Sequence, residues 1–274
     1  MLESTLRWTI YLAAAFVFGP IAGMLTGSLH ATDGSHAATP LVCASPFSGL
    51  LMGLGALGIA LVVGLVAARL LGAAPGMSAA GIVVAWAAWR TGDVDQLIRT
   101  AQSGRPLTIL AAEGAIFGCL AVAMCLAIVI AARDGKAVSP PTLRDRFWGG
   151  PTTPVAVLIA LFAAGVAAWF VGVTPLKGQA VFAAIAAGTL AAAAGRLADF
   201  RLPLASLSVP IAALAVIGPL AGMAIAGSQA VLQMSYKGTL FPLANIAPLD
   251  WVAGAFLGIP LGVSWAGSMI EKKS

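Results

Sequence analysis

One acidic residue lies deep inside an apolar stretch, and its position suits it to chemistry within a membrane. Glu113 falls seven residues after Pro106, in the apolar run 107–132. A carboxylate is costly in hydrocarbon, so it is expected to face the interior of a helix bundle or water. Glu113 is therefore a candidate coupling or pore residue for a proton or cation. The alternative is a structural carboxylate that is protonated or paired with an arginine such as Arg90.

Two Gly-Pro pairs in apolar stretches form a second candidate site. Gly19-Pro20 and Gly218-Pro219 stand in the nearly identical sequences GPIAGM and GPLAGM. Proline interrupts the hydrogen bonds of a helix, and paired broken helices frame the binding sites of many transporters. The alternative is close helix packing, because each of these glycines is followed four residues later by another glycine, and small residues at this spacing let helices approach.

Three potential metal ligands, His30, Asp33 and His36, are spaced three residues apart in a short polar connection. Imidazole and carboxylate groups bind zinc or copper. Gly34 and the small residues around it argue against a regular helix that would align them. They are therefore weak metal candidates, and solvated loop residues are the default interpretation.

The composition assigns these residues to a membrane protein. Hydrophobic residues make up 60% of the 274 residues and charged residues only 9%, whereas a soluble chain carries about 25% charged residues. The apolar runs are long and lack strand alternation, so the predicted fold is an all-α integral membrane bundle of about eight transmembrane helices in one polytopic domain, residues 1–274. The predicted spans are 8–29, 47–70, 74–89, 107–132, 154–173, 178–195, 204–226 and 249–270.

The span 74–89 is the weakest of the eight, because a helix needs roughly 20 residues to cross the hydrocarbon core. The alternative is seven spans with this segment re-entrant. Placement of lysine and arginine favours eight, since ten of the 15 basic residues then share the side of the N-terminus, which is the bias of cytoplasmic loops. The basic connection 90–106 on the opposite side does not fit this bias and keeps the alternative open.

This topology places both termini in the cytoplasm, and the predicted location is a cell membrane, that of the bacterial cytoplasm in particular. Residues 133–153 form the longest predicted cytoplasmic connector. At the start of the last span, Asp250 is expected to cap the helix and Trp251 to lie in the headgroup region, together with Trp8, Trp89 and Trp148.

Similarity between the two ends of the chain predicts an internal duplication. The match that begins at the Gly-Pro pairs continues through the following connections, where Pro40 and Pro46 correspond to Pro242 and Pro248 with the same spacing of six. We therefore expect helical hairpins as repeat units within residues 1–70 and 204–274.

Three functions are compatible with these features. The first is a permease or channel-like protein for a small solute or ion, and the second is a non-catalytic scaffold or accessory subunit of a membrane complex. The third is a membrane signalling or sensor module. Enzymatic activity is not expected, because Cys119 and Cys125 have no histidine within the membrane to activate them, and no cofactor motif is present. The predicted partners are the lipid bilayer and a second copy or another membrane protein, not nucleic acid.

Overall fold

The computed structural model describes residues 2–132 and 142–271, which form helices and no strands. The elements are α1 (Leu2–Ala13), the π-helical turn η1 (Ala14–Phe18), α2 (Gly19–Gly27), α3 (Pro46–Leu71), α4 (Ala73–Trp89), α5 (Val94–Ala101), α6 (Arg105–Ala131), α7 (Leu143–Phe147), α8 (Thr153–Val171), α9 (Lys177–Ala198), α10 (Leu204–Lys237), the 3-10 turn η2 (Pro242–Asn245) and α11 (Pro248–Glu271).

Seven helical segments in the described part of the chain are long and apolar enough to cross a membrane. They are the continuous segment from α1 to α2, followed by α3, α6, α8, α9, α10 and α11. Their outer faces carry large apolar side chains, and Phe47, Phe162 and Phe170 are each 75% exposed. Water would not tolerate so wide an apolar surface. The helical membrane bundle predicted from the sequence is therefore confirmed, and the chain is a multi-pass membrane protein.

The helix α4 is the weakest predicted span and has only 17 residues. It begins directly after α3 and packs against that helix and α11. Beyond its last turn, the Gly92 N–H donates a hydrogen bond of 2.8 Å to the carbonyl of Ala38, in the loop that precedes α3. Because α4 starts where α3 ends and finishes beside the loop where α3 begins, it runs the length of the bundle. It is nevertheless too short to be among the seven candidate spans, so the choice between eight spans and seven stays a prediction.

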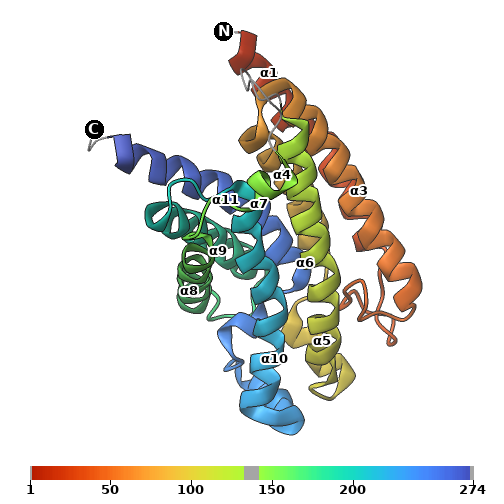
Figure 1. Ribbon diagram of the computed structural model, residues 1–274. Helices are drawn as coiled ribbons and strands as arrows, with labels where there is room; N and C mark the ends of the chain where they lie inside the picture. Colours follow the sequence, from red (N-terminus) through yellow and green to blue (C-terminus); the bar gives the residue numbers. More distant parts are fainter. Residues whose placement is uncertain (1, 133–141, 272–274) are drawn as a thin grey trace.

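Both ends of the described chain lie at one end of the bundle, which Figure 1 shows at the top. We call this the terminal end. The opposite end, where the loop of residues 28–45 and the short helix α5 lie, we call the loop end.

Glycines set the closest approaches between helices. A Cβ atom added to Gly258 of α11 would lie 2.3 Å from the carbonyl oxygen of Ile185 in α9, and one added to Gly114 of α6 would lie 2.2 Å from the carbonyl oxygen of Ala215 in α10. Such contacts are only possible without a side chain, and they let the helix backbones touch, as is usual in membrane bundles.

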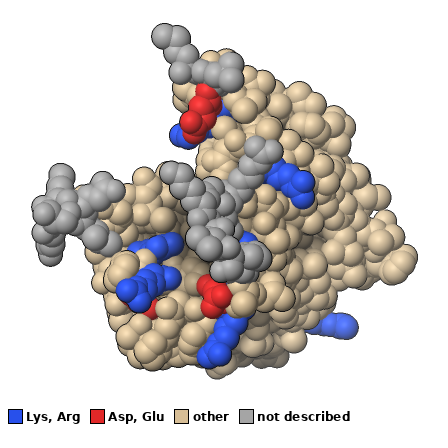
Figure 2. All heavy atoms as spheres, turned by 45° about the horizontal axis from the view of Figure 1, so that its top comes forward, with Lys and Arg blue, Asp and Glu red and all other residues tan. Residues whose placement is uncertain are grey.

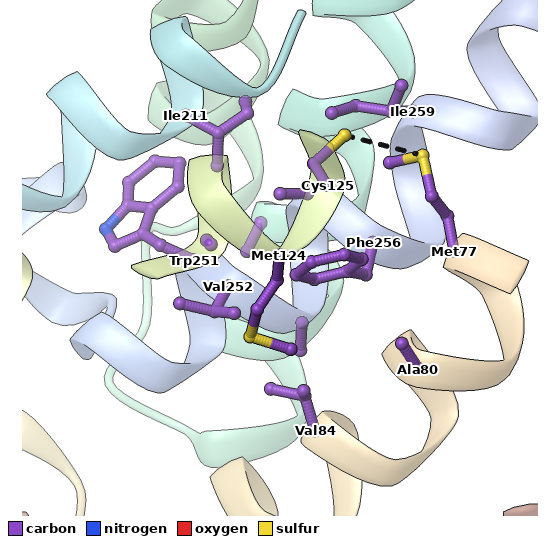
Figure 3. Close-up of a cluster of buried hydrophobic side chains, with 14 of the residues drawn as sticks. Met77, Ala80, Val84, Met124, Cys125, Ile211, Trp251, Val252, Phe256 and Ile259 are labelled. Atoms are coloured by element: carbon purple, nitrogen blue, oxygen red, sulfur yellow. Dashed lines mark hydrogen bonds between the residues drawn. The ribbon is translucent and has the colours of Figure 1, made fainter. Parts of the chain in front are cut away.

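The middle of the bundle is filled by apolar side chains (Figure 3). Met77 of α4, Cys125 of α6 and Phe256 of α11 meet there, with the two sulfur atoms of the first pair 3.8 Å apart. Trp251 also lies in this core and is only 1% exposed. The prediction that it belongs to the headgroup region was wrong, because the first turn of α11 points its indole into the bundle rather than outward.

The loop end is covered by elements outside the membrane spans. In α10 the helix breaks at Gly227, which has a φ of 72°, and the ten residues that follow the break pack against α5. Arg99 of α5 donates to the Ser235 carbonyl and pairs with Asp95 at 2.9 Å. These contacts explain the position of Arg99, one of the three arginines in the basic connection 90–106 that did not fit the expected charge bias.

The terminal end carries exposed basic side chains next to a largely uncharged lateral surface (Figure 2). Its described basic residues are Arg7, Arg69, Arg144, Arg146, Arg196 and Arg201. Within the predicted connector 133–153, residues 133–141 lie outside the described residues. The remainder contains α7, which begins with a capping box in which Thr142 and Asp145 bond to each other's backbone N–H.

Candidate functional site

Buried ionisable groups concentrate at the loop end. Of the four buried acidic residues in the described chain, Asp95, Glu113 and Asp250 lie there and only Asp199 lies near the terminal end. Burying a carboxylate is costly unless it is paired or hydrogen-bonded. The partners of these groups therefore show what holds this end of the molecule together.

Glu113 is 1% exposed and binds the loop 28–45. Its Oε2 atom accepts two hydrogen bonds of 2.8 Å, one from the hydroxyl of Thr39 and one from the backbone N–H of Leu41. Its Oε1 atom is buried and has no hydrogen-bond partner among the described residues. Arg90, named above as a possible partner of a structural Glu113, does not pair with it, and the hydrogen-bond partners of the carboxylate come from the loop.

The loop 28–45 is packed into the bundle rather than draped over it. A Cβ atom added to Gly49 would lie only 2.1 Å from the carbonyl oxygen of Pro40, and one added to Gly53 would lie 3.1 Å from the Pro40 ring. The bond from Gly92 to Ala38 ties the same loop to the end of α4. The two glycines of α3 thus create the recess that the loop occupies above Glu113.

A buried ion pair lies at the start of α9 and α11. The Lys177 ammonium is 2.8 Å from Oδ1 of Asp250 and 3.1 Å from Oδ2, and it donates to the Thr91 hydroxyl at 2.9 Å. Asp250 also accepts a bond of 3.0 Å from the Ala247 N–H, so the prediction that it caps its helix is confirmed. The carboxylate and the ammonium therefore link three segments of the bundle.

Two pockets open at the loop end, on either side of the loop 28–45. The polar pocket has a volume of about 450 Å³ and is lined by Gly27, Ser35, His36, Ala37, Trp89, Arg90, Thr91, Gly92, Asp93, Gln96 and Lys177. The neighbouring pocket, of about 360 Å³, lies between the loop, α5 and the start of α6. Ala37 lines both, so the loop separates them.

The first Gly-Pro pair lies at a helix irregularity and in a helix contact. Its helix contains the π-helical turn η1, whose last hydrogen bond runs from the Gly19 N–H to the Ala14 carbonyl, and Pro20 follows. A Cβ at Gly19 would lie 2.2 Å from Trp86, and one at Gly23 would lie 3.3 Å from Arg90. This glycine face packs α2 against α4.

The second Gly-Pro pair lies in a different environment. A Cβ at Gly218 would lie 2.6 Å from the carbonyl oxygen of Leu243 in η2, and Pro219 lies within α10, which stays helical until Gly227. The two pairs are therefore not brought together in one pocket, and both glycines serve close packing. The internal duplication stays a prediction, although Pro46 and Pro248 each begin a helix.

The three potential metal ligands do not converge. The rings of His30 and His36 lie 4.7 Å apart, whereas Asp33 accepts a bond of 2.9 Å from the Ser35 N–H. Hydrogen bonding to the side chain of Ser35, and then to its N–H, lowers the pKa of the Asp33 carboxyl. Over residues 2–132 and 142–271, no group of three His, Cys, Asp or Glu side chains is placed to hold a metal ion.

Sequence reasoning missed the polar pocket and the Lys177–Asp250 pair. One signal was available, because both residues fall at the starts of spans that open on the same side of the membrane. Asp93 was not singled out either. Burial raises the pKa of its carboxyl, an effect that Lys177 opposes and the nearby carboxylates of Asp95 and Asp250 reinforce.

No family model, no curated protein and no solved structure matches the chain. The function is therefore inferred from the geometry of the loop end.

Proposed function

We propose that the protein is a non-enzymatic permease for a small solute or ion, with its solute entrance at the loop end. The observation that carries the proposal is the buried carboxylate of Glu113 beneath a loop that divides two pockets. Buried ionisable residues in a membrane protein usually mark pathways for ions, protons or substrates. A purely structural bundle gains little from a buried acceptor atom with no partner.

In this proposal the loop 28–45 is the outer gate, and hydrogen bonds to Glu113 hold it closed. An ionised carboxylate holds the Thr39 hydroxyl and the Leu41 N–H by charge-assisted hydrogen bonds, which are about twice as strong as neutral ones. When a proton neutralises the carboxylate, these bonds weaken and the loop can leave its recess. The two pockets would then join above Glu113, and proton uptake would be coupled to solute entry.

The proposed orientation follows the charge bias of the sequence. The terminal end faces the cytoplasm and the loop end faces outward, in the cytoplasmic membrane of a bacterium. The filled apolar core corresponds to a closed state, in which the outer pockets do not reach the terminal end.

The test measures coupled proton movement. Proteoliposomes with entrapped pyranine are exposed in turn to inward gradients of glycine, choline chloride and sodium sulfate, with protein-free liposomes as the blank. For the wild-type protein we expect internal pH to change under at least one gradient. For Glu113→Gln, which keeps the size and an acceptor oxygen but cannot be ionised, we expect no such change at equal folded yield. A flat trace for the wild type under every gradient, or an equal response in the variant, would contradict the proposal.

A native thiol reports on the gate independently. Cys43 lies in the loop 28–45, where its thiol donates to the Pro40 carbonyl at 3.4 Å. In a Cys119→Ser background, Glu113→Gln should raise the rate at which a maleimide modifies Cys43 by at least threefold, because the loop is released more often. Burial raises the pKa of this thiol, and the charge of Glu113 raises it further, so each rate is divided by the thiolate fraction obtained from the pH dependence of modification in the same protein.

A scaffold or accessory subunit is the second candidate, and the closed apolar interior favours it. Gly55 and Gly58 on the outer face of α3 are exposed, with open space beside Gly58, so that face could receive another helix. If Gly58→Leu dissociates a complex in native membranes and the wild-type protein shows no coupled proton movement, the scaffold function is the better explanation.

A further inference from the structure

The polar pocket holds two oppositely charged side chains, neither of which makes an ion pair with the described residues. Among the described charged groups at the loop end, Arg99 pairs with Asp95 and Lys177 pairs with Asp250. Arg90 and Asp93 both line the pocket, but neither makes a hydrogen bond through its side chain or an ion pair with the described residues. The pocket thus offers one unpaired guanidinium and one unpaired carboxylate.

Packing against α2 fixes the position of the aliphatic part of the Arg90 side chain. The aliphatic part of Arg90 lies along the glycine face of α2, with its Cγ and Cδ atoms 3.3 and 3.6 Å from the Cβ positions of Gly23 and Gly27. A Cβ at Gly23 would press on the arginine, whereas one at Gly27 would lie in ordinary van der Waals contact with it. Arg90 therefore runs close along the glycine face of α2 at the edge of the pocket.

Asp93 lies directly before the first residue of α5. It is the N-cap residue of α5, yet its side chain makes no capping hydrogen bond, and it is half-buried. A partly buried carboxylate without a hydrogen-bond partner loses hydration without compensation. A ligand with an ammonium group would provide the missing partner.

We propose that the polar pocket binds a small zwitterionic solute, an α-amino acid in its chemistry, with the solute carboxylate on Arg90 and its ammonium on Asp93. Arginine binds carboxylates through two parallel N–H bonds, and Ser35, His36 and Gln96 supply further hydrogen-bonding groups at the wall. A volume of about 450 Å³ falls within the range of small-molecule sites.

Ligands with a single charge fit this pocket less well. An anion would gain Arg90 but meet the carboxylate of Asp93, and a cation would gain Asp93 but meet the guanidinium. Five elements contribute the charged and titratable groups around Asp93, which are His36 of the loop 28–45, Arg90 after α4, Asp95 of α5, Lys177 of α9 and Asp250 of α11. Since Lys177 is neutralised by Asp250, the free charges of the pocket are one positive and one negative.

This inference names the solute of the proposed permease and depends on that function for its biological meaning, but binding is measured without transport. Full-length protein in nanodiscs is titrated with glycine, L-serine and L-glutamine by isothermal calorimetry. Methylamine and sodium acetate, which each carry half of the zwitterion, are the comparison ligands. We expect at least one amino acid to bind at least tenfold more tightly than either half.

Variants assign the two ends of the ligand. Arg90→Gln and Asp93→Asn should each weaken binding at least tenfold, and Arg90→Lys should weaken it less than Arg90→Gln because the charge is kept. The matched controls are Arg7→Gln and Glu3→Gln, whose exposed side chains lie at the terminal end; both should bind as the wild type does. Unchanged thermal unfolding midpoints show that the variants fold.

Several results would overturn the assignment. One is wild-type protein that binds none of the three amino acids with a Kd of about 1 mM or tighter. The others are binding of methylamine or acetate as tight as that of the amino acids, and unchanged amino-acid binding by Arg90→Gln and Asp93→Asn. The two proposals fail separately. Amino-acid binding without coupled proton movement leaves the pocket assignment standing and removes the permease, whereas coupled movement without amino-acid binding removes only the assignment of the ligand.

Discussion

Removing one member of the buried pair between Lys177 and Asp250 should destabilise the protein, and the loss of stability should depend on which member is removed. The Asp250 side chain is 1% exposed, whereas the Lys177 side chain is 12% exposed and borders the polar pocket. In Lys177→Met the carboxylate would remain buried with only the Ala247 N–H as a partner. Removing one member of a buried pair costs about 3–5 kcal/mol, and we expect a loss of this size in the free energy of unfolding.

The complementary substitution, Asp250→Asn, should lower the free energy of unfolding by less than Lys177→Met does. In Asp250→Asn the amide oxygen can still accept the bond from Ala247, so the helix cap is kept. The Lys177 ammonium retains the Thr91 hydroxyl and can turn toward water in the pocket. We therefore expect a loss of about 1–3 kcal/mol, in the range for a hydrogen bond to a charged group.

The double variant is the decisive one. Lys177→Met with Asp250→Asn leaves no buried charge, so it should be more stable than Lys177→Met alone by at least about 1 kcal/mol, which is a typical coupling for residues in contact. Equilibrium unfolding in mixed micelles with increasing dodecyl sulfate measures all three differences. The control is Arg7→Gln, which breaks the pair between Arg7 and Glu3, whose side chains are 47% and 75% exposed; it should cost less than about 1 kcal/mol.

Two results would refute this reasoning. The first is a Lys177→Met variant whose free energy of unfolding falls by less than about 1 kcal/mol, since leaving a buried carboxylate unpaired should destabilise the protein by more than that. The second is a double variant whose loss equals the sum of the single losses, because the two groups would then not be coupled.

Three further predictions concern packing, pH and topology. Gly258→Ala should cost about 1–3 kcal/mol in thermal unfolding, because its methyl group would meet a backbone carbonyl of α9, whereas Gly58→Ala, with open space around it, should cost nothing; equal effects would contradict the helix contact. Glycine binding should weaken with a midpoint above pH 3.8 as the pH falls, because burial raises the pKa of Asp93 and only the ionised carboxylate attracts an ammonium; a midpoint at or below that value in calorimetry argues against Asp93 as the partner. In a Cys43→Ser, Cys119→Ser background, an impermeant maleimide should label Asp33→Cys in intact cells, whereas Arg144→Cys should react only after permeabilisation; the reverse pattern inverts the topology.

Much of the fold could be predicted because a membrane makes secondary structure a local matter. With no water in the hydrocarbon, each segment must satisfy its own backbone, so a long apolar run can only be a helix. Predicted spans such as 47–70 and 107–132 therefore match α3 and α6 closely. The same rule does not locate the end of α10, where a break at Gly227 is followed by a further helix outside the predicted span.

The candidate site was predicted only in part. The burial of Glu113 follows from its position in an apolar run, but its partners Thr39 and Leu41 lie 74 and 72 residues away, in a loop with no regular periodicity. Trp251 shows the same limitation, because its place near a span end was correct but the direction of its side chain depends on the neighbouring helices.

The sequence by itself determined that lipid surrounds most of this protein, that its long apolar runs are helices, and that one of these helices contains a carboxylate whose burial is costly. These properties depend on residues that are neighbours in the chain. Only the tertiary structure decided that Lys177 meets Asp250, that Glu113 holds the loop 28–45, and that Arg90 and Asp93 share one pocket. Contacts of this kind join residues from separate segments, so they depend on how closely glycine faces let the helices approach. That distance is set by packing between helices and not by the sequence of any single helix.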